Sequence, residues 1–213
     1  PAPARPPAQV AAVAPTPVAS GGRMPALGER WTYRYTDLWR PGVKAEIIHT
    51  VTEIRPHEVI ETLSTVVGGR TYVGNAASPL QAEIREWKLG EIAFREFAPF
   101  APGFDLPRPG SRLEDFHTPI LQDTGRVDWL VKSSVAAEEV TVPAGRFQAV
   151  KVVLEGGGAG QVARGLTSFQ MTVWYAPQSK RYVKAAFKSY ERTPGSTNSL
   201  HHNDLYELVS APR

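Results

Sequence analysis

Apolar and polar residues alternate along much of this chain with a period of two, which is the spacing of a half-buried β-strand. In the first such run the aromatic residues Trp31, Tyr33 and Tyr35 fall on one side, and we place Trp39 on the same side. Two further runs follow after short turns that contain proline. The three predicted strands form an antiparallel meander with a buried aromatic side, at 31–39, 43–54 and 59–67.

A β-hairpin is predicted at 139–153, where two β-prone runs flank a Pro-Ala-Gly loop. Pro143 has its φ fixed near the value of the first corner of a type I turn. Gly145 can take the positive φ that closes such a loop with a bulge. A second pair of strands follows at 168–175 and 181–190, and a closing strand at 205–209.

The middle of the chain is less regular. Short strands at 83–89 and 91–97 can pair across Gly90, although 78–89 also allows a short helix. The stretch 98–110 carries four prolines, which exclude a helix interior or a central strand, so we expect an ordered loop or flap there. Further strands at 70–73 and 126–135 bring the prediction to between nine and eleven strands.

A sheet this long with so little helix must close on itself or stack, because each strand has an apolar side to bury. We therefore predict an all-β fold, an antiparallel meander that forms a curved half-barrel or barrel-like sheet with little helix. Residues 1–24 are rich in proline and alanine without periodicity, which favours an extended polyproline II tether. Residues 25–213 are predicted to form a single antiparallel β domain.

Charge and composition remove several classes of function. The 24 Lys and Arg residues against 21 Asp and Glu residues give a net charge of +3, which does not indicate a nucleic-acid partner. The sequence has no cysteine, which excludes disulfides and thiolate metal sites among its residues. It also has no apolar run of about 18 residues, the length that predicts a membrane-spanning helix. Because the sequence starts at Pro1, we expect a removed signal peptide upstream, and a lipid anchor there stays an option.

Residue patterns for catalysis or metal binding are weak. His202 and Asp204 would share one side of a strand and are the best metal candidate, although a solvated turn is the simpler interpretation. The glycines at 156–160 lack the Lys-Ser/Thr ending of a phosphate loop and indicate a flexible connection. No Gly-x-Ser-x-Gly motif is present, and an enzyme would need His117 or His202 beside a carboxylate. We therefore predict a protein that is not an enzyme, with no catalytic residue, no metal and no cofactor.

Aromatic residues are the strongest candidates for binding. Alternation on the strand 168–175 sends Trp174 to the side opposite Phe169 and Tyr175. On the next strand Tyr182, Lys184 and Tyr190 share one side, where lysine stems can lie along aromatic rings. An ordinary sheet with one solvated face is the simpler interpretation, and the functional one is that this face binds an acidic or amphiphilic partner. The candidate binding residues are Trp31, Tyr33, Trp174, Tyr182, Lys184 and Tyr190.

Several short motifs occur together in this sequence. They are Gly-x-x-Trp-x-Tyr at 28–33, Val-Pro-Ala-Gly-x-Phe-x-Ala-x-Lys-Val at 142–152, Trp-Tyr-Ala-Pro at 174–177, Val-Lys at 183–184 and Glu-Leu-Val at 207–209. In this order they resemble the TapB-like domains, a β-rich bacterial envelope family of poorly defined function. The resemblance covers 28–210, and Pro-Gln-Ser-Lys-Arg at 177–181 departs from the glycine-rich turn expected there. It implies export and a β fold, and it brings no catalytic residues.

These observations predict a non-catalytic exported protein of the bacterial periplasm or outer-membrane surface. It would bind a protein partner, which could also grip the Pro-rich tail, or support assembly of an envelope or surface complex. The alternative is a carrier of lipid or another hydrophobic ligand in the half-barrel cavity. That alternative fails where the chain's own aromatic residues or the flap at 98–110 fill the cavity.

Overall fold

The computed structural model describes residues 24–40, 42, 44–80, 83–90, 92–100, 110, 129–158, 165–192 and 199–212. The predictions for residues 1–23 of the tether, for most of the flap at 98–110 and for His117 lie outside these residues. No helix in the described residues is long and apolar enough to cross a membrane.

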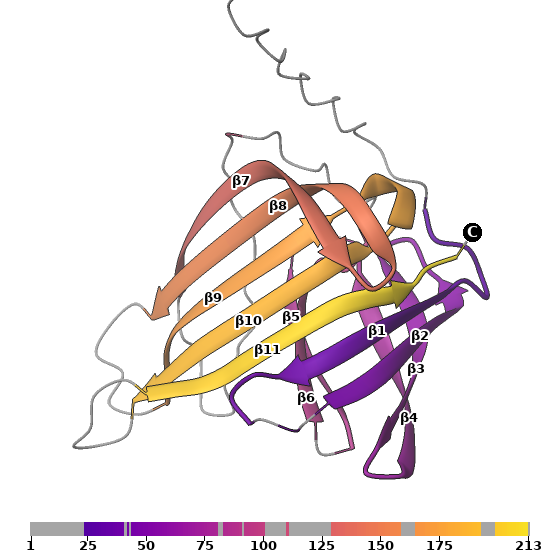
Figure 1. Ribbon diagram of the computed structural model, residues 1–213, viewed down its shortest axis with the longest axis horizontal. Coiled ribbons are helices and arrows are strands. Elements are labelled where there is room, and N and C mark those ends of the chain that lie inside the picture. Colours follow the sequence, from indigo (N-terminus) through magenta and orange to yellow (C-terminus); the bar gives the residue numbers. More distant parts are fainter. Residues whose placement is uncertain are drawn as a thin grey trace, which may run out of the picture.

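Nine strands form one antiparallel sheet in the order β4-β3-β2-β1-β11-β10-β9-β8-β7 (Figure 1). The predicted N-terminal meander is present, and β1 also pairs with β11, so the first and last strands lie side by side. The strands are β1 (Arg30–Asp37), β2 (Lys44–Ile54), β3 (Glu58–Val67), β4 (Arg70–Pro79), β7 (Trp129–Val142), β8 (Gly145–Gly158), β9 (Gly165–Tyr175), β10 (Tyr182–Arg192) and β11 (Ser199–Ser210).

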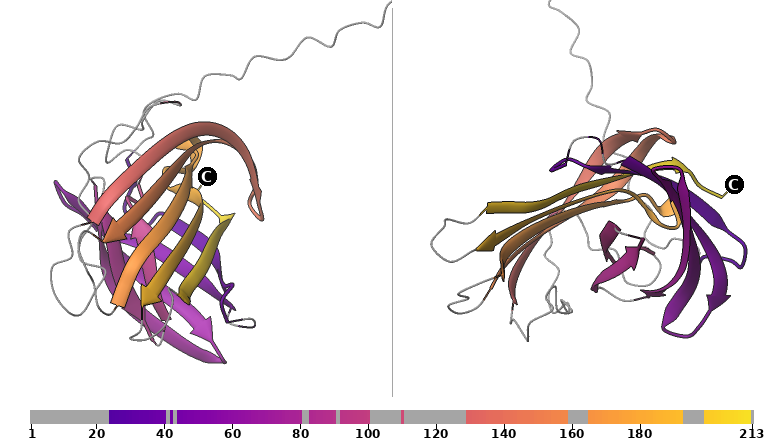
Figure 2. Two further views of the ribbon diagram at one scale, coloured as in Figure 1. Left: turned by 90° about the vertical axis from the view of Figure 1, so that its left-hand side faces the viewer. Right: turned by 90° about the horizontal axis from the view of Figure 1, so that it is seen from below.

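The large sheet is strongly curved, and a separate two-stranded hairpin lies inside the curve (Figure 2). This hairpin consists of β5 (Ile84–Leu89) and β6 (Ile92–Phe97), paired across Gly90 as predicted. The alternative prediction of a short helix at 78–89 is wrong, because β4 extends to Pro79 and β5 begins at Ile84. The predicted fold class is confirmed: the protein is all-β, and its main sheet is a curved meander that does not close into a barrel.

Aromatic residues of β1 point to the inner side of the curve, where the β5–β6 hairpin covers them. Trp31, Tyr33 and Tyr35 are buried, as the alternation predicts. Phe94 of β6 packs against the Tyr35 ring, with ring centroids 5.1 Å apart. The inward position predicted for Trp39 is wrong, because β1 ends at Asp37 and Trp39 lies in the following loop with its side chain half-exposed.

The hairpin predicted around the Pro-Ala-Gly loop is present, and it is longer than predicted. Its strands β7 and β8 have 14 residues each and meet at the pair formed by Val142 and Gly145. Its tip contacts β11, because the Ala144 amide donates a hydrogen bond to the Leu208 carbonyl at 2.9 Å. The flexible connection predicted at 156–160 is wrong for its first residues, since β8 runs to Gly158. A Cβ on Gly156 would lie 2.2 Å from the Phe169 ring, so the glycine makes room for that ring.

Replacing Gly145 by valine is expected to cost about 1 kcal/mol or more in the free energy of unfolding. Gly145 has a φ of +132°, a backbone conformation that a β-branched residue adopts only with strain. Chemical denaturation of the variant measures the cost. Ala144→Val is the control, because Ala144 is the exposed neighbour in the same turn without a positive φ. Equal midpoints for both variants would contradict this account of the turn.

Candidate functional site

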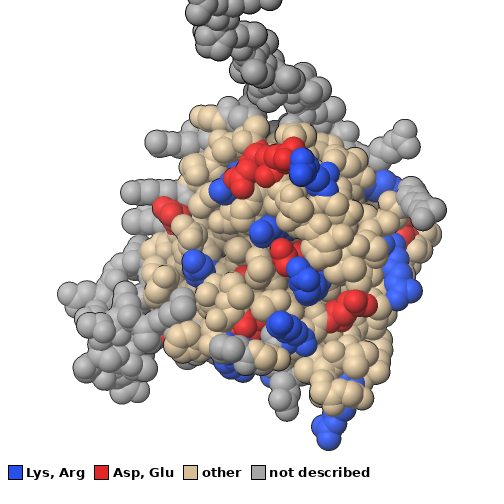
Figure 3. All heavy atoms as spheres, in the orientation of Figure 1, with Lys and Arg blue, Asp and Glu red and all other residues tan. Residues whose placement is uncertain are grey.

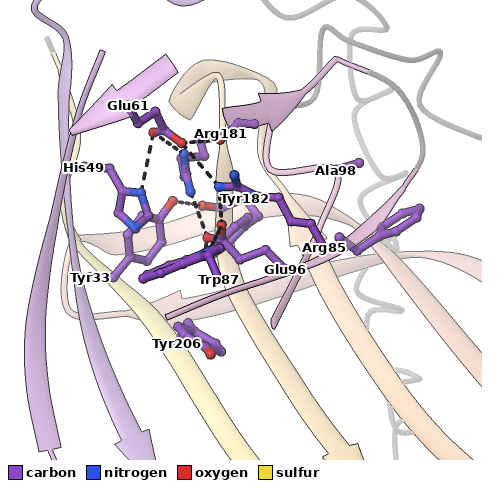
Figure 4. A network of polar contacts seen from close by, with 12 residues as sticks. Tyr33, His49, Glu61, Arg85, Trp87, Glu96, Ala98, Arg181, Tyr182 and Tyr206 are labelled. Carbon is purple, nitrogen blue, oxygen red and sulfur yellow. Dashed lines mark hydrogen bonds and ion pairs between the residues drawn. The ribbon is translucent and has the colours of Figure 1, made fainter. Parts of the chain in front are cut away.

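A group of charged side chains is buried between the sheet and the β5–β6 hairpin (Figure 4). Arg181, which directly precedes β10, lies between Glu61 of β3 and Glu96 of β6, and all three are 0% exposed. Its Nη1 donates to Glu61 Oε1 at 2.5 Å and its Nη2 to Glu96 Oε1 at 2.8 Å. A single arginine therefore joins the N-terminal meander, the inner hairpin and the C-terminal half of the sheet.

A second arginine balances the charge of the two glutamates. Arg85 of β5 donates from Nη2 to Glu96 Oε2 at 2.8 Å, and the same nitrogen lies 3.6 Å from Glu61 Oε2. Its Nη1 donates to the Ala77 carbonyl of β4. Because the two arginines and two glutamates have no net charge together, the cluster can be buried without an unpaired ion.

Neutral donors complete the coordination of the two carboxylates. Glu96 also accepts hydrogen bonds from the Tyr182 hydroxyl and from Trp87 Nε1, the latter at 2.9 Å. Glu61 accepts a hydrogen bond from the Ser78 hydroxyl. These contacts come from β3, β4, β5, β6 and β10, so the network fixes the hairpin to the sheet through side chains rather than through a backbone ladder. We call the set Glu61, Ser78, Arg85, Trp87, Glu96, Arg181 and Tyr182 the buried ion network.

The chain positions Arg181 through a short turn. A 3₁₀ helix at Pro177–Ser179 is followed by Lys180 in the left-handed conformation, with φ 60°. The Ser179 carbonyl accepts a hydrogen bond from Trp31 Nε1 at 2.8 Å, which ties this turn to β1. The Arg181 guanidinium then lies against the rings of Phe100, Tyr182 and Tyr33, with centroid distances of 5.0, 5.3 and 5.6 Å. Aromatic faces around a paired guanidinium add a favourable electrostatic contact.

His49 lies beside the network but does not act as a charged member of it. Its Nδ1 is 3.5 Å from Glu61 Oε1, which is long for a hydrogen bond, and its ring packs edge-on against Tyr33 and Trp87. Burial lowers the pKa of His49, and the Arg181 charge lowers it further. His49 is therefore a neutral imidazole at pH 7, and the network keeps its charge balance.

The arginines hold both glutamates in the ionised form. Burial alone would raise the pKa of Glu61, but the charge of Arg181, followed by contacts with His49 and Arg85, lowers it to about 2. For Glu96, burial is again outweighed by Arg181 and Arg85, so its pKa lies well below the usual value. A carboxylate with so low a pKa and no exposed surface is a poor general acid or base near neutral pH.

Acid is expected to destabilise the fold through these two glutamates. Because their pKa values in the folded chain lie below the value of 4.5 in the unfolded chain, the stabilisation is complete above about pH 4.5. It is lost as the pH falls through about 2, the folded-state value for Glu61. His49 acts in the same direction, since the unfolded chain binds its proton more readily. Urea denaturation across this range measures the loss, and a free energy of unfolding that stays constant would contradict the assignment.

Asp204 of β11 forms a second buried polar site with the opposite pH behaviour. It accepts a hydrogen bond from the Tyr35 hydroxyl at 2.8 Å, while its Oδ2 is buried and has no hydrogen-bond partner in the described part of the chain. Burial raises the pKa of Asp204 to about 6, and the charge of Asp37 adds to the effect. This group therefore stabilises the fold below pH 3.8, and that contribution is lost as the pH rises through about 6.

Asp204→Asn is expected to stabilise the protein above pH 6 by about 1 kcal/mol or more, because asparagine keeps the acceptor for Tyr35 and removes a buried charge. The gain should disappear below pH 3.8, where the carboxyl of the parent protein is itself neutral. Thermal unfolding of both proteins over this pH range tests the sign. The stability difference between variant and parent should be larger at neutral pH than at acid pH. The reverse order would contradict the raised pKa of Asp204.

The structure separates the predicted binding residues into two groups. Trp31, Tyr33 and Tyr182 are buried on the inner side of the curve, and Tyr33 donates a hydrogen bond to the Tyr182 carbonyl at 2.5 Å. Trp174, Lys184 and Tyr190 lie on the outer side, where Tyr190 is 37% exposed but Trp174 is buried, at 9%. The shared side predicted for Tyr182 and Lys184 is wrong, because the register shifts between them: Tyr182 pairs with Tyr175, and Lys184 pairs with Trp174.

On the outer side, Trp174 lies between two lysines. The Nζ atoms of Lys151 and Lys184 are each 5.4 Å from its ring centroid. Each lysine also lies near a carboxylate, with Lys151 2.8 Å from Glu138 and Lys184 3.9 Å from Glu207. Figure 3 shows charges of both signs interspersed over this face, without a large area of one sign. Trp174 is only 9% exposed and both lysines have partners within the chain, so a binding role for this face stays a prediction.

The histidine and acid candidates are only partly described. His202 Nδ1 lies 2.9 Å from the Ser189 hydroxyl, its cross-strand neighbour. Asp204 accepts a hydrogen bond from Tyr35. The described residues contain no group of three or more His, Asp and Glu side chains arranged to hold a metal ion. His117 lies outside the described residues.

No protein-family model matches the sequence, and no curated protein matches it. Its structure is similar to that of a candidate lipoprotein from Parabacteroides distasonis ATCC 8503, with a TM-score of 0.45, 14% identity and coverage of 91% of this chain and 100% of that chain. It is also similar to a candidate exported protein with a YmcC-like fold from Bacteroides fragilis NCTC 9343, with a TM-score of 0.43, 12% identity and coverage of 92% and 100%. Because both TM-scores lie below 0.5, neither similarity supports a family or a function for this chain. The resemblance to the TapB-like domains is not confirmed.

Proposed function

We propose that this is a non-catalytic exported protein of the bacterial envelope that binds a protein partner, or supports assembly of a complex, through its outer surface. The observation that carries the proposal is the β5–β6 hairpin, which occupies the inner side of the curved sheet. The aromatic residues of β1 face this hairpin and are buried. A partner protein would therefore meet the outer face or an edge of the sheet.

The absence of accessible reactive groups in the buried ion network supports a non-catalytic role. Glu61, Glu96 and Arg181 are each 0% exposed, and both terminal nitrogens of Arg181 are paired with the two carboxylates. Substrate could reach them only if the hairpin left the sheet. The network is thus suited to holding the fold together, with its charges balanced inside the domain.

The free edge of β4 is the strongest candidate contact for a protein partner. β4 has β3 as its neighbour in the sheet and lies at the end of the strand order. Val73 on β4 and Val66 on β3 are 66% and 56% exposed. An unpaired strand edge with apolar side chains beside it can accept an extended segment of another protein by backbone hydrogen bonding. Arg85 binds the Ala77 carbonyl near the end of β4, so we place the contact at the exposed Val73 in the first half of the strand, although the turn at Gly90 packs closely on the neighbouring Tyr72 ring.

Native mass spectrometry of the protein isolated from its own cells tests this proposal. We expect a complex with a second protein, and we expect Val73→Lys to reduce it, because a lysine on an edge strand disfavours strand addition. Leu27→Lys is the matched control, since Leu27 is also 66% exposed and lies before β1. An unchanged complex in the Val73 variant would contradict the edge as the contact, and the absence of any protein complex would contradict the function.

The alternative function, a carrier of lipid or another hydrophobic ligand, would need the apolar inner side of β8, β9 and β10 to open, because its side chains are buried within the chain. Leu154, Met171 and Phe187 form a cross-strand row there, and all three are buried. The same mass measurement separates the two functions. A carrier would show a small-molecule adduct on the single chain, which survives Val73→Lys.

A further inference from the structure

The loop that follows β1 presents two large apolar side chains to solvent. Leu38 is 50% exposed and Trp39 is 49% exposed, and they are adjacent in the chain. We call residues 38–40 the Trp39 loop. Isolated exposed apolar residues are common on protein surfaces, but a leucine and a tryptophan side by side at a loop form a compact apolar projection.

Hydrogen bonds to one buried carboxylate hold the Trp39 loop in place. Asp37 Oδ1 accepts hydrogen bonds from the backbone amides of Trp39 and Arg40 at 2.8 and 2.9 Å. Asp37 Oδ2 accepts one from Arg40 Nε at 2.6 Å, and the Leu38 amide donates to the Asn203 carbonyl at 2.7 Å. The exposure of the two side chains is therefore built into a fixed loop, and little ordering is needed when the loop meets a surface.

Cations flank the Trp39 loop on both sides. Lys44 lies on β2, opposite Thr36 of β1, and Lys188 lies on β10, opposite Asn203 of β11. Both lysines are exposed, and within the described part of the chain neither is within ion-pair distance of a carboxylate. The Arg40 side chain is 61% exposed although its Nε binds Asp37. The apolar projection thus lies beside two lysines that no carboxylate of the described residues pairs, and beside Arg40, whose charge is paired with Asp37.

We propose that the Trp39 loop is a membrane-contact element that inserts Leu38 and Trp39 into the interfacial region of an anionic lipid surface. Tryptophan favours the headgroup level of a bilayer, and lysine and arginine heads reach anionic lipid phosphates while their stems stay on apolar surface. A projecting pair of side chains fits a deformable lipid surface better than a protein interface, which needs about 800 Å² of complementary surface on each partner. The proposal does not depend on the protein-binding function.

Co-sedimentation of the purified chain with vesicles tests the element. We expect binding to phosphatidylcholine vesicles that contain phosphatidylglycerol, and weaker binding to phosphatidylcholine alone. The double variant Leu38→Ser/Trp39→Ser should lose about tenfold in partition coefficient on the anionic vesicles, because it removes most of the apolar area that the loop can bury in lipid. Lys44→Gln/Lys188→Gln should reduce binding to the anionic vesicles and leave binding to the neutral ones unchanged.

Val66→Ser/Val73→Ser is the control, because it removes two exposed apolar side chains from β3 and β4 and leaves the loop intact. Since all six positions changed in the three variants are exposed, unchanged thermal midpoints should show that every variant folds. Equal vesicle binding by the loop variant and the parent protein overturns the proposal. A parent protein that binds no vesicles also overturns the proposal. This includes the result that the loop variant loses a protein complex and the parent protein binds no lipid.

Discussion

Arg181→Met is expected to destabilise the protein by about 3–5 kcal/mol, because it leaves Glu61 and Glu96 buried together without their shared cation. Methionine fills a similar volume and keeps the apolar contacts, so the cost reports the missing charge and its hydrogen bonds. Chemical denaturation at neutral pH measures the change. The loss should shrink at acid pH, where protonation removes the repulsion between the two carboxyl groups.

Arg55→Met is the matched control. Arg55, in the turn between β2 and β3, also bonds two glutamates, Glu53 on β2 and Glu58 on β3, but all three side chains are on the surface. Its loss should leave the free energy of unfolding almost unchanged. The triple variant Arg181→Met/Glu61→Gln/Glu96→Gln should recover part of the loss, because it removes the buried charges together. A loss in Arg181→Met no larger than in Arg55→Met would contradict the role of the buried ion network.

Phe94→Ala is expected to cost about 3–5 kcal/mol, the usual range for removing a fully buried aromatic ring. Phe94 is 0% exposed, and its ring stacks on Trp87 at 4.1 Å and meets Tyr35 of β1 edge-on. The substitution removes an apolar contact between the inner hairpin and the sheet, and it changes no charged member of the buried ion network, although Phe94 also packs on Trp87, which donates to Glu96. Thermal and urea unfolding measure the loss, with Leu27→Ala as the exposed control. A small loss would mean that the hairpin contributes little to the core.

Local structure could be predicted well where the sequence carries both alternation and turn residues. The Pro143 and Gly145 loop identified the β7–β8 hairpin, and Gly90 identified the turn between β5 and β6. Both features depend on neighbouring residues alone. The pairing of β1 with β11 could not be predicted in this way, because it joins residues such as Tyr35 and Tyr206 that are far apart in sequence.

The buried ion network was missed, although one signal for it exists. Glu61 lies in phase with Val59 and Leu63 on β3, and an acid at an apolar position of an alternating strand indicates a buried, paired carboxylate. Its partner Arg181 carries no such signal, since it lies in an irregular turn. The prediction from alternation that Tyr182 and Lys184 share one side also failed beside that turn. The register shift after Tyr182 changes the side on which the following residues lie.

Amide hydrogen exchange of the β5–β6 hairpin tests most directly whether the half-barrel is permanently filled by the chain itself. If the buried ion network and Phe94 hold the hairpin as part of the core, the ladder amides of β5 and β6 should exchange only with global unfolding, at the same free energy as those of β1 and β10. Exchange of the hairpin amides at a much lower free energy than the sheet would contradict this account, because it would show that the hairpin leaves the concave side while the sheet stays folded.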